Sequence, residues 1–229
     1  MGLSIQVGSL AYLLVNDAEG AASLREDFSR LNAFLGSVGL EPHIEPQDCA
    51  VFSCDMYGYL GLHYLRRVAA HLDLEGVLPP PGQEDDFQDE AMEAYYLSAS
   101  RPSGGWLDRF FGRRPMNRTF DHLMLHSDAE GFYLPQTFPQ VLMAPDKFGV
   151  PGSMVGSSVR LLEECRRLAQ ALELPLDLDP ESDLVWDATQ TQGQGDTQWQ
   201  RYAIESFTCL RLHKACIHSL ETGAAIVFC

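Results

Sequence analysis

The sequence is short of positive charge. Its 229 residues include 16 lysines and arginines against 32 aspartates and glutamates, which gives a formal net charge of −16. A surface of that sign repels phosphate backbones and anionic lipid, so the composition argues against binding of nucleic acid or of membrane surfaces. Two interpretations of the acidity remain open: it keeps the protein soluble, or it attracts a basic protein partner.

Long apolar runs are also missing. No stretch reaches the roughly 18 apolar residues of a membrane-spanning helix. The apolar opening of the chain lacks a basic region and a cleavage motif, so we interpret it as part of the fold rather than as a secretion signal. None of the six cysteines belongs to a Cys-x-x-Cys pair, and several lie inside apolar helical patterns. We therefore expect reduced thiols in a cytoplasmic protein.

The common catalytic motifs are absent as well. The chain has no Gly-x-Ser-x-Gly elbow, no Gly-Lys-Ser/Thr phosphate loop and no His-Glu-x-x-His helix, which argues against the enzyme classes that use them. The Gly- and Ser-rich stretch 152–158 opens a predicted helix. Its amide groups could hold an anion, but helix capping explains the stretch more simply.

Apolar residues repeat at helical spacing in four segments, which are residues 17–38, 57–72, 159–172 and 196–222. Asp17 is placed to cap the first helix, and Ser157 or Ser158 the third. The second helix is apolar on nearly every side, which predicts a central position. Within it, we expect Arg66 or Arg67 to reach an acidic partner.

Strand patterns are fewer and shorter. We predict a short strand at residues 140–143 and a closing strand at 225–228. Residues 3–15 mix the strand and helix periods, and we favour a short helix there, whereas residues 42–55 are predicted to be a loop.

These elements predict an α+β protein, a helix-dominated single domain with a small, mainly antiparallel sheet. The absence of a βαβ rhythm disfavours a doubly wound sheet. We expect one domain over residues 1–229, with an acidic, proline-rich loop at 78–90 and a basic and aromatic insertion at 101–118.

Residues 121–135 are predicted to form a β-hairpin with a polar loop. His126, Asp128 and Glu130 lie within five residues of each other, and such groups can act as a general base or bind an ion. They are our candidate catalytic residues. The alternative is ordinary turn chemistry, in which Asp and Ser bond the nearby backbone and Gly131 supplies an unusual φ.

Residues from other segments are candidates for binding a ligand near that loop. They are His63, Tyr59, Tyr133, Ser157 and Ser158. The imidazole is relevant only if it faces the loop, because a lone buried histidine is usually a hydrogen-bonded core residue. The serines are equally suited to helix capping.

Cys209, His213 and Cys216 lie on one side of the last predicted helix, as a zinc site would require. No fourth ligand is evident, and cysteine is also a common small core residue. We therefore assign no metal ligand and expect no cofactor.

Five stretches of the chain carry a resemblance to known proteins; they are GLSI at residues 2–5, LHYLRR at 62–67, HSDAEGFYLP at 126–135, GSSVRLLEE at 156–164 and AIVF at 225–228. In these stretches the chain resembles a group of bacterial and plant proteins to which no activity is assigned. The resemblance implies one continuous domain but transfers no catalytic residue. The basic stretch 109–118 is not part of the shared pattern.

Two functions are therefore in competition. The net charge and the missing motifs favour an interaction protein that neutralises a basic protein partner. The alternative is a hydrolase or small-ligand-binding enzyme with its site at the predicted hairpin. The sequence leaves open whether the protein is an enzyme and what its oligomeric state is.

Overall fold

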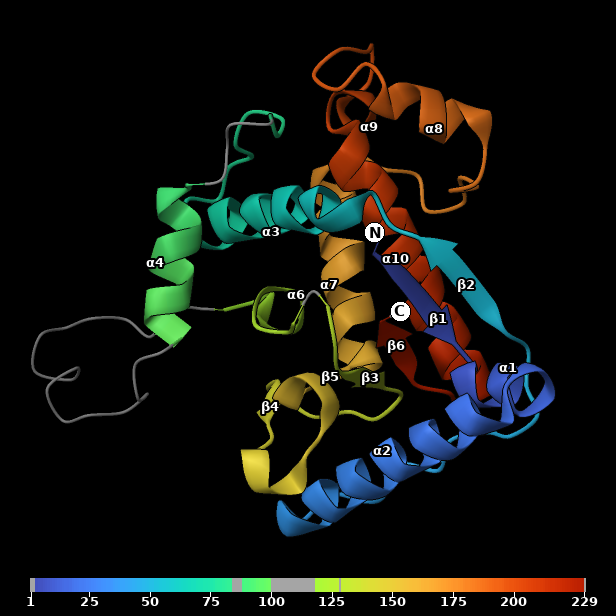
Figure 1. Cartoon of the computed structure of the whole chain (residues 1–229). Helices are drawn as coiled ribbons and strands as arrows, with labels where there is room; N and C mark the ends of the chain where they lie inside the picture. Colours follow the sequence, from blue (N-terminus) through green and yellow to red (C-terminus); the bar gives the residue numbers. More distant parts are fainter. Residues whose placement is uncertain (1–2, 84–87, 100–117, 128, 229) are drawn as a thin grey trace, which may run out of the picture.

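A sheet of short strands runs between layers of helices (Figure 1). The computed structural model describes residues 3–83, 88–99, 118–127 and 129–228. The strands are β1 (Ser4–Val7), β2 (Phe52–Asp55), β3 (Phe132–Leu134), β4 (Leu142–Met143), β5 (Met154–Ser157) and β6 (Ile226–Phe228). The helices are α1 (Ser9–Asn16), α2 (Ala18–Ser37), α3 (Gly58–Leu74), α4 (Glu90–Ala99), α6 (Asp121–Met124), α7 (Ser158–Ala171), α8 (Asp183–Thr189), α9 (Gln198–Arg201) and α10 (Ala203–Thr222), with 3₁₀ turns at Asp146–Phe148 and Pro151–Ser153.

In the described part of the chain the sheet has six strands in the order β2-β1-β6-β3-β5-β4. The pairs β1–β2, β1–β6, β3–β6 and β4–β5 are antiparallel, and β3–β5 is parallel. The last strand of the chain, β6, therefore lies in the middle of the sheet. The predicted class, a helix-dominated α+β domain with a mainly antiparallel sheet, is confirmed.

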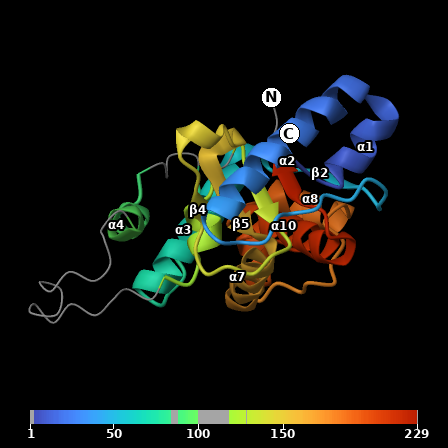
Figure 2. The same cartoon turned by 90° about the horizontal axis from the view of Figure 1, so that it is seen from below.

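The alternation of side chains along β3 shows how the sheet separates two cores. Phe132 and Leu134 belong to one apolar cluster and Tyr133 to the other, as the two-residue period of a strand requires. The first cluster is shared with α1 and α2, the second with α3, α7 and α10. Figure 2 shows α2 on the opposite side of the strands from α7 and α10.

Local sequence signals fix the two amphipathic helices α2 and α7. The Asp17 carboxylate accepts hydrogen bonds from the amides of Glu19 (3.1 Å) and Gly20 (3.0 Å), which confirms the predicted cap of α2. Ser157 caps α7 in the same way by accepting from the amide of Arg160 (3.2 Å). Both helices bury their apolar faces against the sheet. The position at which each helix begins is set by its capping residue, because that side chain satisfies backbone amides of the first turn.

The predicted central helix is α3, and its arginines are buried. Arg67 Nε donates to Asp89 (2.9 Å), and His71 Nε2 lies 3.0 Å from the same carboxylate. This confirms the expected acidic partner and ties α3 to the residue that precedes α4.

Outside residues 121–135, three predictions about secondary structure are wrong. Residues 3–15 contain β1 as well as α1, and β2 lies in the segment 42–55 that was predicted to be a loop. In β2 the partly buried Phe52 and the buried Cys54 alternate with the exposed Ser53 and Asp55. The four-residue pattern is too short to predict a strand by itself, and the strand pairs with β1. The helix predicted at 196–222 is broken at Tyr202, whose hydroxyl donates to the Pro79 carbonyl (2.5 Å).

The predicted strands at the end of the chain and near residue 142 are present as β6 and β4. The predicted insertion at 101–118 lies outside the described residues except for Arg118, and the loop at 78–90 is described without residues 84–87. Nowhere in the described ranges is there a helix with the length and apolar character needed to cross a membrane.

Candidate functional site

Residues 121–135 do not form the predicted hairpin. The first four of these residues form α6, and β3 pairs with β5 and β6 instead of with the preceding segment. The reason lies in α7, where the buried Glu164 carboxylate accepts from the amides of His122 (2.9 Å) and Leu123 (2.7 Å). A carboxylate at the amino end of a helix satisfies donors that have no partner within the helix.

The other end of α6 is held by a guanidinium group. Arg66 of α3 donates from Nε to the carbonyl of Leu123 (2.9 Å) and from Nη2 to the carbonyl of His126 (2.8 Å). A helix that makes so few internal hydrogen bonds is therefore stabilised by two buried side chains from outside it, Glu164 and Arg66.

His126 is a core residue. Its ring stacks on Tyr133 at a centroid distance of 4.0 Å, and its two nitrogens lie 2.9 and 3.1 Å from the carbonyls of Ser127 and Phe132. Burial lowers the pKa of His126 to about 4, so near neutral pH the ring carries one proton and donates to one of those carbonyls. The catalytic role predicted for this imidazole stays a prediction.

The two carboxylates predicted beside this imidazole are placed differently. Asp128 lies outside the described residues. Glu130 is exposed, and its amide and that of Ala129 donate to Ser127 Oγ, both at 3.2 Å. These bonds are the turn chemistry that was the alternative for this loop. The catalytic role of Glu130 and the enzymatic alternative also stay predictions.

The five predicted ligand-binding residues do not share one environment. Tyr59 is exposed on α3 and His63 is partly buried. The Tyr133 hydroxyl donates to the carbonyl of His122 (2.8 Å). Ser157 Oγ donates to the carbonyl of Gln136 (2.6 Å), while Ser158 Oγ lies 2.9 Å from Ser219 Oγ. The last three hydroxyls are thus engaged inside the protein, and a binding role for any of the five stays a prediction.

The described cysteines are thiols and form no disulfide. Cys209 Sγ donates to the carbonyl of Cys165 at 3.3 Å, and Cys216 is fully buried on the same helix as His213. Over the described residues, no three His, Cys, Asp or Glu side chains come together in a way that could hold a metal ion.

A set of exposed charges of a single sign lies elsewhere, between α7 and α9. We call residues 173–196 the acidic segment. All seven of its carboxylates are exposed; they are Glu173, Asp177, Asp179, Glu181, Asp183, Asp187 and Asp196. From residue 168 to residue 200 the chain has no lysine, arginine or histidine, so no cation within this stretch offsets these charges.

Two cations on α10 fasten the acidic segment to the body of the protein. Arg211 lies 2.7 Å from Glu181, and Lys214 lies 3.5 Å from Asp179. Arg211 also donates to the carbonyls of Pro180 and Asp55, and through Asp55 it reaches the end of β2. Asp55 is itself exposed, and its backbone carbonyl shares Arg211 with the acidic segment. The amide of Glu181, followed by Lys214, lowers the pKa of Asp179, which keeps that carboxylate ionised.

Helix α8 presents apolar side chains among these carboxylates. Its capping residue, Ser182, accepts from the amide of Val185, which is buried. Leu184 is 54% exposed and Trp186 49% exposed. The covered part of the indole lies against Tyr57 and Phe207, with ring centroids 6.3 and 5.9 Å away. The acidic segment thus combines exposed negative charge with a half-exposed aromatic ring. Helix α8, which carries this ring, is labelled in Figure 1.

Neither this segment nor α8 was among the predicted sites. The signal was present in the sequence as 33 consecutive residues, 168–200, with carboxylates but no cation. These carboxylates are spread over a long stretch, so they form a less conspicuous pattern than the dense acidic cluster at residues 84–90.

The fold and the surface together define an acidic, helix-dominated α+β protein with seven exposed carboxylates in residues 173–196. The profile of a family described as "Putative DNA-mimic protein" matches residues 1–228, so the chain belongs to that family. The match covers both ends and the middle of the chain, as the sequence resemblance does. Neither the curated proteins nor the solved structures contain a match.

Proposed function

We propose that the protein is a DNA mimic, which binds the DNA-contacting surface of a basic protein through its acidic segment. The observation that carries this proposal is the run of seven exposed carboxylates without a neighbouring cation in sequence. The family to which the chain belongs supports it. The composition already suggested a basic protein partner, and a DNA-binding protein is a specific kind of basic partner.

Carboxylates can replace phosphates as partners for lysine and arginine. Both are oxyanions that accept charge-assisted hydrogen bonds, and arginine binds either one with two parallel N–H groups. Asp183 and Asp187 are four residues apart on α8, which places them about 6 Å apart along the helix axis. A single DNA strand carries one charge per about 3.4 Å of axis, so α8 reaches about half that density and the flanking turns add to it.

Charge alone would bind basic proteins without discrimination. Leu184 and Trp186 provide the second element, because interface hot spots are enriched in tryptophan surrounded by polar residues. We place this binding in the cytoplasm, where DNA-binding proteins are available to a mimic. The reduced state of the described cysteines is compatible with that compartment.

Removing charge from the acidic segment should weaken partner binding. The variant replaces five carboxylates that form no ion pair among the described residues by their amides: Glu173→Gln, Asp177→Asn, Asp183→Asn, Asp187→Asn and Asp196→Asn. At about 0.5 kcal/mol per exposed pair, the loss is about 2–3 kcal/mol, or roughly 30- to 150-fold in Kd. The matched control removes the same charge from exposed positions elsewhere: Glu41→Gln, Asp48→Asn, Glu93→Gln, Glu130→Gln and Glu221→Gln.

The measurement has two stages. Proteins from the native host are captured on the immobilised chain and eluted with duplex DNA, and each eluted protein is purified. Its release from a fluorescent DNA duplex is then followed by anisotropy as the chain or a variant is added. The wild type and the control should displace DNA equally, and the acidic-segment variant should need a much higher concentration. Capture that duplex DNA cannot reverse would refute mimicry, and equal loss in both variants would refute the placement of the surface.

Replacing Trp186 by alanine should weaken the same complex without changing its charge. A half-exposed interface tryptophan contributes about 1–2 kcal/mol, so we expect a roughly 5- to 30-fold increase in Kd. The loss should persist at high salt, because it removes apolar contact rather than ionic attraction. Anisotropy competition at low and high ionic strength checks this, with Leu97→Ala, another exposed apolar residue, as the control. A loss that disappears at high salt would contradict an apolar contact.

A further inference from the structure

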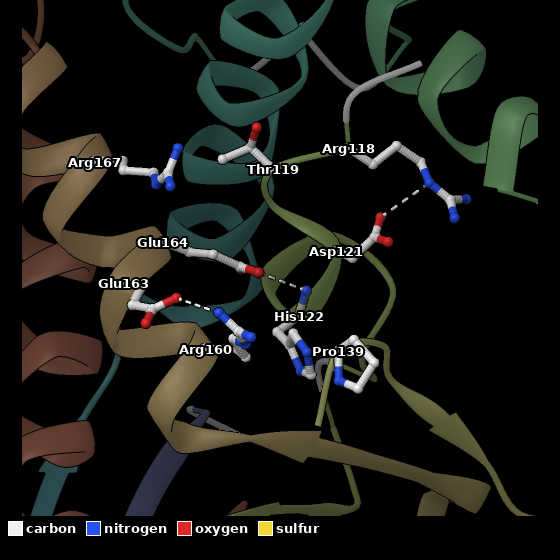
Figure 3. A pocket seen from close by; sticks show the side chains of 9 residues that line it. All are labelled: Arg118, Thr119, Asp121, His122, Pro139, Arg160, Glu163, Glu164 and Arg167. Atoms are coloured by element: carbon white, nitrogen blue, oxygen red, sulfur yellow. Dashed lines mark hydrogen bonds and ion pairs between the residues drawn. The ribbon is translucent and has the colours of Figure 1, made fainter. Parts of the chain in front are cut away.

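A polar pocket lies between α7 and α6 (Figure 3), and no residue of the acidic segment lines it. Its volume is about 240 Å³. Arginines line it from two parts of the chain: Arg160 and Arg167 from α7, and Arg118 from the residues before α6. The chain has only 16 lysines and arginines, and three of them line this pocket together with the carboxyl groups of Asp121, Glu163 and Glu164.

The spacing on α7 explains how the pocket is built. Residues 160, 163, 164 and 167 line it together, and this i, i+3, i+4, i+7 spacing places them on one face of the helix. Arg160 and Arg167 are therefore about 10 Å apart along the axis. Two guanidinium groups at that separation can reach one small ligand from opposite sides.

Carboxylates of the pocket pair with two of the three arginines but not with the third. Glu163 pairs with Arg160 at 2.8 Å and Asp121 with Arg118 at 3.5 Å. Glu164 is 4% exposed, and its two oxygens accept the amides at the start of α6. Arg167 forms no ion pair within the described ranges of the chain, so one guanidinium charge remains without a partner.

Two buried donors at the pocket lack an acceptor. His122 Nδ1 accepts from the amide of Ser157 (3.0 Å), so the proton of the neutral ring is on Nε2. His122 is 2% exposed, and among the described residues neither its Nε2 nor Arg160 Nε has a hydrogen-bond partner. The carbonyls of Phe138 and Pro139 lie near the imidazole but outside hydrogen-bonding geometry. A buried donor without an acceptor costs about 1–3 kcal/mol, and a bound oxyanion would satisfy both.

We propose that this pocket binds a small phosphate-bearing anion, either inorganic phosphate or a phosphomonoester. Arg160 and Arg167 would hold the phosphate oxygens, and the Nε2–H of His122 would donate to one of them. A volume of about 240 Å³ accommodates a phosphate with a small organic group. The net charge of −16 does not exclude an anion, because charges beyond about 8 Å are screened at physiological salt.

The site is independent of the proposed binding of a basic protein. It lies on α7 and α6, it uses cations rather than carboxylates, and its ligand is a small anion. Its test therefore needs no protein partner, and its outcome leaves the DNA-mimic proposal unaffected.

Isothermal titration calorimetry of the full chain with inorganic phosphate and with ribose 5-phosphate tests the proposal. We expect saturable binding of one equivalent. If inorganic phosphate binds more tightly, the ligand is free phosphate; if ribose 5-phosphate binds more tightly, the ligand is a phosphomonoester. Arg167→Gln should weaken binding at least tenfold. The control is Arg166→Gln, which removes the same charge from the adjacent exposed residue of α7 outside the pocket, and it should bind as the wild type does.

Three outcomes would overturn the site. The first is that neither compound gives saturable heat up to about 10 mM, which is about the weakest affinity of interest. The second is that R166Q and R167Q weaken binding equally. The third is that R167Q binds as tightly as the wild type. Circular dichroism of both variants establishes that they are folded, and both positions are exposed.

Discussion

Replacement of Glu164 by alanine is expected to lower the free energy of unfolding by about 3–5 kcal/mol. The amides of His122 and Leu123 lose their acceptor in a buried environment, at about 1–3 kcal/mol for each. The missing side-chain atoms leave a cavity that adds to the loss. Urea denaturation followed by circular dichroism measures the change, and a loss below about 1 kcal/mol would show that solvent replaces the carboxylate at no cost.

Glu164→Gln is the matched variant, and it reveals a pH dependence. Burial raises the pKa of Glu164 from 4.5 to about 8. The folded state therefore keeps this proton to higher pH than the unfolded state, so the wild type loses stability as pH rises from about 4.5 to about 8, by up to about 1.4 kcal/mol per unit. Glutamine carries no such proton. The stability of E164Q relative to wild type should improve from pH 5 to pH 8, and a difference that stays constant would contradict the raised pKa.

Replacement of Arg66 by alanine is expected to cost about 3–4 kcal/mol. The carbonyls of Leu123 and His126 lose their donors, and a large buried side chain leaves a void between α3 and α6. Arg66→Lys is the control, because it keeps the charge and most of the volume but loses the fork that reaches two carbonyls. It should retain part of the stability, measured by the same denaturation.

Arg66 and Glu164 hold opposite ends of one four-residue helix. Once either is removed, α6 is less ordered and the other contributes less. The double variant R66A/E164A should therefore lose less stability than the sum of the two single variants, by about 1 kcal/mol or more. Strict additivity would mean that α6 keeps its structure with one end unsupported.

The long amphipathic helices could be predicted because their information is local. The apolar stripe of α2 and the capping residues Asp17 and Ser157 lie within a turn of the structure they specify. The class of fold followed from such segments. The break before α10 could not be predicted, because Tyr202 is held by the carbonyl of Pro79, 123 residues earlier in the chain.

The predicted hairpin was wrong for the same physical reason. Residues 121–126 have the alternation of a strand, but their backbone groups are bonded by Glu164 and Arg66, which are 41 to 60 residues away. The sequence of this segment contains no sign of either side chain. The arginine pocket was hidden likewise, because it forms only when α7 packs beside α6.

The acidic segment is the opposite case. Its charge pattern can be read directly from residues 168–200. Only the exposure of its carboxylates required the structure. What the sequence could not show is that α8 carries Trp186 half-uncovered, since this depends on packing against Tyr57 and Phe207.

The place of β6 has a consequence for how the protein is made. This strand is the last element of the chain, yet it joins β1 to β3 at the centre of the sheet. During synthesis the pair β1–β2 and the group β3–β4–β5 cannot join into one sheet until β6, which ends at residue 228, has left the ribosome. Contacts between the two ends of a chain are also the slowest to form. A nascent chain that stalls before β6 would therefore expose the unpaired edges of β1 and β3. Such edges can pair with other chains, so the stalled chain would depend on chaperones.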